Sequence, residues 1–167
     1  MDGNGFSRRP PLVSRKPMWT SLILGCALRV GEPVAAPLRV TPGEIHATSA
    51  EPGLALALEA GLSDALARRG ALGGDGGLKV DLTVLDASTE VVAADGETSV
   101  RRAHLTLAVQ RWGSQPARVV LSGARAYTVA ATDGAAAAAA RAEAFSGLAR
   151  SLTADAADWL LTSTGSP

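Results

Sequence analysis

Three segments with alternating apolar residues, set between two segments of helical period, most strongly constrain the fold of this chain. Alternation places every second side chain on one face, so each segment predicts a strand with a single buried face. Turn-forming residues separate the three segments, namely Asp95-Gly96 and Gly113–Pro116, which favours an antiparallel meander. The inward positions are Leu78, Val80, Leu82 and Val84, then Ala103, Leu105, Leu107 and Val109, then Val119 and Leu121.

The two flanking segments predict helices. The first runs from about Glu51 to Arg69, with Ser49 as a candidate cap, Pro52 near the first turn and Gly70 as the stop. Its apolar face consists of Leu54, Leu58, Leu62, Ala65 and Leu66. The second begins after the cap Thr132-Asp133 and passes through Ala135–Ala140, where alanine favours helix over a low-complexity segment. Its periodic positions are Arg141, Phe145, Leu148, Leu152, Ala156, Trp159 and Leu160.

An additional strand precedes the first helix, because Leu38, Val40 and Ile45 are apolar. Pro42-Gly43 interrupts it, which favours an edge position or a bulge. A sheet with one apolar face needs helices to cover it. We therefore predict an α+β two-layer sandwich of order β-α-β-β-β-α, with two helices packed on one face of a roughly four-stranded sheet. It forms a single domain over residues 38–163, followed by a C-terminal tail over 164–167.

The N-terminal segment resembles a bacterial lipoprotein signal. An apolar run from Met18 to Gly25 follows Arg8, Arg9, Arg15 and Lys16, and Ile23–Cys26 has the form of a lipobox. The run is too short for a transmembrane helix, which needs about 20 apolar residues. On this interpretation residues 1–25 are a signal peptide, Cys26 is the lipidated N-terminus and residues 26–37 are a linker. The alternative is that Cys26 is an ordinary buried thiol in a core strand.

Composition excludes several classes of function. The 16 basic and 16 acidic residues balance, but residues 1–25 hold four basic side chains and one acidic one, so the remainder carries a net charge of −3. That balance gives no support to a nucleic-acid binder. A single cysteine excludes internal disulfides and cysteine-based zinc sites. The two histidines, His46 and His104, belong to no metalloprotease motif, and nucleophile-elbow and phosphate-loop motifs are absent from the sequence. We predict that the chain is not an enzyme and uses no cofactor or metal.

One region of the sequence is basic. No Asp or Glu occurs from Thr98 to Thr132, whereas five arginines do: Arg101, Arg102, Arg111, Arg118 and Arg125. Arginine binds phosphate through paired, charge-assisted hydrogen bonds, so this region suits an anionic ligand. Alternatively, the charges keep edge strands from self-associating. Alternation places Arg102 and His104 opposite the apolar face, and a slip of one residue in the hairpin register decides whether Arg118 or Arg125 joins them.

Three further features stand out after Cys26, namely Glu51-Pro52-Gly53-Leu54, the segment Leu62–Gly70, and Gly123 with Tyr127. Through these residues the chain resembles the LPS-assembly lipoprotein family, of the LptE type, over nearly all of the segment after Cys26. The chain departs from the family pattern at Ile45, Ala47 and Ser49, where members tend to have Phe, Asn and Thr.

The resemblance implies a non-enzymatic lipoprotein anchored on the periplasmic side of the outer membrane. Such a protein plugs and supports the LPS-assembly β-barrel, of the LptD type, and binds lipopolysaccharide during its insertion. Ala27 after the cysteine, in place of Asp, is compatible with sorting to the outer membrane. Arg101, Arg102, Arg118 and Arg125 are then candidates for binding the phosphates of lipid A. The alternative is an anchored periplasmic accessory or regulator of a cell-wall synthase or a lipid transporter.

Overall fold

The computed structural model describes residues 38–47, 51–74, 77–130 and 132–163. The elements along the chain are β1 (Val40–His46), α1 (Leu54–Arg68), β2 (Leu78–Ala94), β3 (Thr98–Trp112), β4 (Ala117–Ala130) and α2 (Gly134–Thr162). This order and the α+β class confirm the prediction from the sequence. The predicted signal peptide 1–25, Cys26, the linker 26–37 and the tail 164–167 lie outside the described residues.

The sheet has the order β1-β2-β3-β4. β1 pairs with β2 in parallel, so α1 serves as the crossover connection, while β2, β3 and β4 form the predicted antiparallel meander. The register of β1 shifts between Pro42 and Ile45, as the Pro42-Gly43 pair predicted for an edge strand.

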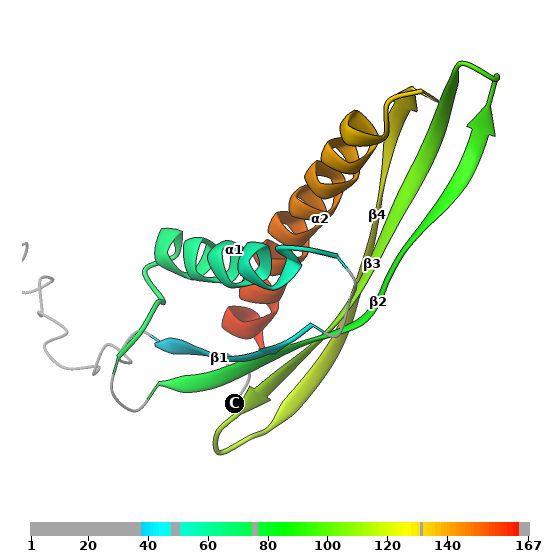
Figure 1. Ribbon diagram of the computed structural model, residues 1–167. Helices are drawn as coiled ribbons and strands as arrows, with labels where there is room; N and C mark the ends of the chain where they lie inside the picture. The colour runs from blue at the N-terminus through cyan, green and yellow to red at the C-terminus, as the bar shows by residue number, and fades with distance from the viewer. Residues whose placement is uncertain (1–37, 48–50, 75–76, 131, 164–167) are drawn as a thin grey trace, which may run out of the picture. The chain divides into compact units, whose positions relative to one another are not determined.

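Both helices cover the same face of the sheet (Figure 1). The core lies between α1, α2 and the inward side chains of the strands, which include Leu82, Leu105 and Leu107, all fully buried. Gly123 lets α2 approach β4 closely, because a Cβ there would lie 3.2 Å from Cδ2 of Leu148. No helix in the described part of the chain combines the length and apolar character needed to cross a bilayer.

The strands β2, β3 and β4 extend beyond the alternating segments from which they were predicted. β2 and β3 continue as a hairpin to the turn at Asp95-Gly96, where Gly96 has a φ of 92°. The register of β2 shifts between Val84 and Asp86 and again between Val91 and Ala93. After each shift, the side chains that follow point to the opposite face from the one that simple alternation predicts. The strand therefore continues although the alternation of apolar and polar residues in the sequence is interrupted.

The helix ends differ in how well the sequence predicted them. α1 begins at Leu54, three residues later than expected, and its N-cap is Gly53, with a φ of 77° and no side-chain cap. The predicted cap Ser49 lies outside the described residues. α2 has the predicted cap, since the Asp133 side chain accepts a hydrogen bond from the backbone N–H of Ala136 at 2.9 Å.

Candidate functional site

The register of the β3–β4 hairpin separates the predicted arginine cluster onto two faces. Gln110 pairs with Arg118 and Arg102 pairs with Ala126, so Arg102 and Arg118 lie on the open face of the sheet, away from the helices. Arg101, Arg111 and Arg125 lie on the helix-covered face. Along β3 the Arg102 and Gln110 positions are about 27 Å apart at the usual rise per residue. The four candidate lipid A residues therefore do not form one cluster.

On the open face, Glu90 joins Arg102 to His104. Nη1 of Arg102 donates to Oε1 of Glu90 at 3.2 Å, and Nε2 of His104 lies 3.1 Å from the same oxygen. The hydrogen bond with His104, aided by electrostatic attraction to His104 and Arg102, lowers the pKa of Glu90. An anionic ligand at Arg102 would thus compete with a carboxylate that already occupies it.

Arg118 borders a hollow of about 240 Å³ at the other end of the open face. The remaining lining residues are His46, Asp81, Thr83, Ala108, Gln110 and Trp112. Asp81 organises this end, because Nε1 of Trp112 donates to its Oδ2 at 2.6 Å and the backbone N–H of Glu44 donates to its Oδ1 at 2.8 Å. Partial burial favours the protonated acid, yet these hydrogen bonds and the charges of nearby cations lower the pKa of Asp81 overall.

Sequence reasoning missed Asp81 and Trp112. Asp81 lies between the inward residues Val80 and Leu82, so alternation alone places it on the open face. The contact with Trp112 depends on the β2–β3 register, in which Trp112 pairs with Lys79. Within the residues that the structure describes, no three His, Cys, Asp or Glu side chains gather as a metal site.

On the helix-covered face, Arg111 has a structural position. It is 5% exposed, and its Nε and Nη2 donate to the carbonyl oxygen of Gln115 at 3.2 and 2.9 Å. Its Nη1 donates to Oγ of Ser163 at 2.9 Å, and its guanidinium lies 5.8 Å from the ring centre of Trp159. Arg111 therefore ties the β3–β4 turn to the end of α2.

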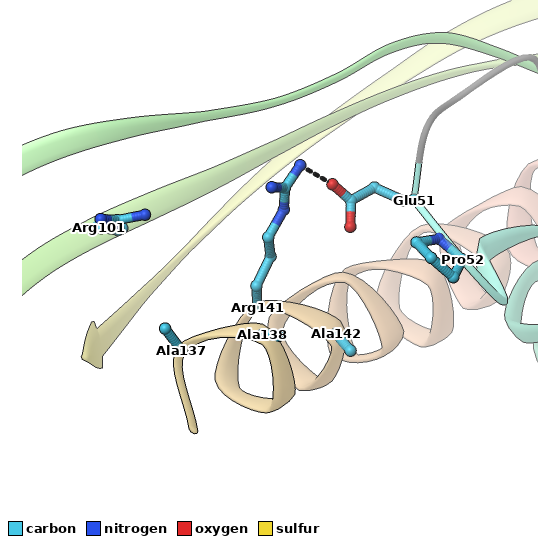
Figure 2. A pocket seen from close by; sticks show the side chains of 7 residues that line it. All are labelled: Glu51, Pro52, Arg101, Ala137, Ala138, Arg141 and Ala142. Atoms are coloured by element: carbon cyan, nitrogen blue, oxygen red, sulfur yellow. Dashed lines mark ion pairs between the residues drawn. The ribbon is translucent and has the colours of Figure 1, made fainter. Parts of the chain in front are cut away.

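Arg125 and Arg101 occupy different surroundings on that face. Arg125 packs against Gly147 of α2, where a Cβ would collide with the guanidinium. Arg101 borders a groove of about 560 Å³ together with Glu51, Pro52, Arg141 and three alanines of α2, Ala137, Ala138 and Ala142 (Figure 2). Arg141 forms an ion pair with Glu51, whose side chain is 7% exposed.

Comparisons with known proteins find similarity in structure only. No family model matches the chain, and no curated protein matches it. A minor lipoprotein from Acinetobacter baumannii has a similar fold, with a TM-score of 0.54, 17% sequence identity, and coverage of 78% of this chain and 100% of that one. A protein from Xanthomonas campestris matches with a TM-score of 0.49, 17% identity, and coverage of 75% and 85%.

Rare lipoprotein B from Shewanella oneidensis matches with a TM-score of 0.42, 13% identity, and coverage of 74% and 92%. At these identities the likeness is one of fold. The described residues of this chain therefore share the fold of a solved bacterial lipoprotein, the Acinetobacter protein.

Proposed function

We propose that this chain is an outer-membrane lipoprotein that plugs and supports the LPS-assembly β-barrel and assists lipopolysaccharide insertion into the outer leaflet. Four observations support the proposal, and the first three concern the anchor, the fold and the family. The segment before Cys26 has the form of a lipoprotein signal, the fold is similar to that of a bacterial lipoprotein, and Glu51–Leu54 with Leu62–Gly70 resembles the LPS-assembly lipoprotein family.

The polar open face of the sheet is the observation on which the plug role depends most. The lumen of a membrane β-barrel is lined by polar side chains, so a plug needs a surface that satisfies their hydrogen bonds. On the open face Arg102, Glu90 and His104 form one polar cluster, and Oγ1 of Thr106 lies 3.2 Å from Oγ of Ser122. The opposite face is buried under the helices and supplies the core.

The lipid anchor is tested by labelling cells with a palmitate analogue. The wild-type chain should take up the label and fractionate with the outer membrane, whereas Cys26→Ser should do neither. A Cys26→Ser chain that is labelled as strongly as the wild type would contradict acylation at this residue.

The partner is tested by crosslinking in the intact envelope. A photoreactive amino acid at Ala124, which is exposed on the open face, should capture a large β-barrel protein. The matched control places the same reagent at Leu107, which is buried under the helices and should capture nothing. Capture of a cell-wall synthase or an ABC transporter, with no barrel, would overturn the plug role and favour the alternative of an accessory lipoprotein.

A further inference from the structure

The groove beside Arg101 is separate from the open face on which the proposed plug role rests. It lies on the helix-covered side, between β3, the first half of α2 and the segment Glu51-Pro52 (Figure 2). Its volume of about 560 Å³ falls in the range of small-molecule pockets. Alanine and proline form much of the wall, so most of the groove is apolar, and Arg101, Arg141 and Glu51 add its charged groups.

Arg101 is the unpaired charge in this groove. Its Nε is buried and has no hydrogen-bond partner, and no carboxylate forms an ion pair with its guanidinium, among the residues described by the structure. Arg141, by contrast, is held by Glu51. Two guanidinium groups and one carboxylate leave one excess positive charge. A partly buried cation without a counterion is costly, and a bound anion would remove that cost.

We propose that this groove binds a small amphiphile with one anionic group, a phosphate or a carboxylate, and a short aliphatic body. The anionic group accepts hydrogen bonds from Arg101, whose planar guanidinium suits both chemistries. The aliphatic body packs against Ala137, Ala138 and Pro52, where the small side chains leave room for it. The inference does not depend on the barrel partner, because it concerns the chain alone.

The carboxylate of Glu51 opposes anion binding in the groove. Its carboxylate neutralises Arg141 and repels an arriving anion, so it competes with the ligand for the positive charge of the groove. Replacing it with the uncharged amide in Glu51→Gln should therefore strengthen anion binding. If the groove recognised only the apolar part of a ligand, Glu51→Gln would not increase its affinity for anions.

The test uses the purified full chain carrying Cys26→Ser and measures binding of butyl phosphate, pentanoate, inorganic phosphate and neutral 1-butanol by calorimetry. We expect butyl phosphate and pentanoate to bind about tenfold more tightly than inorganic phosphate, because their chains bury CH₂ groups. Arg101→Gln should weaken both by about tenfold or more, as expected for a lost charge-assisted hydrogen bond. Glu51→Gln should tighten them severalfold.

Arg150→Gln is the matched control, since it removes the same charge from an exposed position on α2 outside the groove and should leave binding unchanged. Thermal unfolding of each variant checks that the fold persists. Equal affinity of wild type and Arg101→Gln for butyl phosphate would overturn the proposal. The proposal would also be overturned if 1-butanol bound as tightly as butyl phosphate. The same holds if inorganic phosphate bound as tightly as butyl phosphate, which would indicate a free-phosphate site.

Discussion

Gly61 of α1 lies directly against Thr153 of α2, where a Cβ on Gly61 would come within 2.6 Å of Oγ1 of Thr153. Thr153 is fully buried, and its hydroxyl donates to the carbonyl oxygen of Ala149 at 2.7 Å within its own helix. The hydroxyl therefore needs no partner from α1, and the glycine allows the two helices to meet closely. This contact fixes the helical layer that covers the sheet.

Gly61→Val should destabilise the domain because it overfills this helix contact. Overpacking of a core typically costs about 1–3 kcal/mol, with Gly61→Ala at the lower end. The matched control is Gly134→Ala at the start of α2, where no atom lies within 4 Å of an added Cβ. That change should be neutral or stabilise by about 0.5 kcal/mol. Urea unfolding of the wild type and the three variants measures both effects, and equal stability of Gly61→Val and wild type would contradict the close contact.

Asp133→Ala should weaken the start of α2, because the Asp133 carboxylate accepts from the backbone N–H of Ala136. Loss of an N-cap side chain costs about 1 kcal/mol of unfolding free energy. Asp133→Ser should recover most of the loss, since its hydroxyl can accept the same hydrogen bond. The comparison is again made by urea unfolding, and a Ser variant no more stable than the Ala variant would argue against capping.

Most of the fold was predictable because it follows local periods in the sequence. Alternation identified the inward residues of β2 and β3, and the helical repeat identified α2 with its cap at Asp133. The far half of β2 was not predictable, since two register shifts break the alternation there. In that half Val91 and Val92, although apolar, are 61% and 47% exposed.

The candidate site was harder to predict because it depends on register, which is a property of strand pairs. The sequence left open whether Arg118 or Arg125 shares a face with Arg102, and the Gln110 to Arg118 pairing assigns Arg118 to that face. The pair of Arg141 with Glu51 joins the segment before α1 to α2, and no local pattern in either segment indicates it. The binding of lipid A by any of these arginines stays a prediction.

Arg111→Ala should destabilise the domain although the residue belongs to the basic segment. The change removes the paired hydrogen bonds to Gln115 and the contact with Ser163, all partly buried, and we expect a loss of about 2–3 kcal/mol. Arg111→Lys should recover little, because an ammonium group lacks the planar fork that reaches Gln115. Arg118→Ala, an exposed control on the next strand, should change the unfolding free energy by less than about 0.5 kcal/mol. If Arg111→Lys is as stable as the wild type, the positive charge alone, and not the planar hydrogen-bonding geometry, accounts for the stabilisation by Arg111.

Acid should destabilise the domain partly through Asp81. Its pKa is lower in the folded chain than the ordinary value of 3.8, so the folded state favours the carboxylate. The stability that it contributes is complete above that ordinary value and is lost as pH falls below it through the folded pKa. Asp81→Asn should be less stable at neutral pH and should lose stability less steeply on acidification. The unfolding free energy of Asp81→Asn should still fall somewhat on acidification, because the pKa values of Glu90 and Asp95 are also lowered. Urea unfolding between about pH 6 and 2 measures the free energy of unfolding of wild type and Asp81→Asn. If the two chains lose stability equally on acidification, Asp81 does not contribute to the acid destabilisation.

If lipid A meets the open face, the two arginines of that face should bind its phosphates and the two on the helix side should not. Arg102→Ala with Arg118→Ala should then weaken binding of detergent-dispersed lipid A by about tenfold, because charge-assisted hydrogen bonds are lost. Arg101→Ala with Arg125→Ala should have a smaller effect. Glu90→Gln should strengthen binding, since Glu90 occupies Arg102 in the unliganded chain. Arg150→Ala, an exposed change on α2, controls for net charge. Lipid A affinity that responds equally to all of the arginine losses would indicate nonspecific attraction to positive charge.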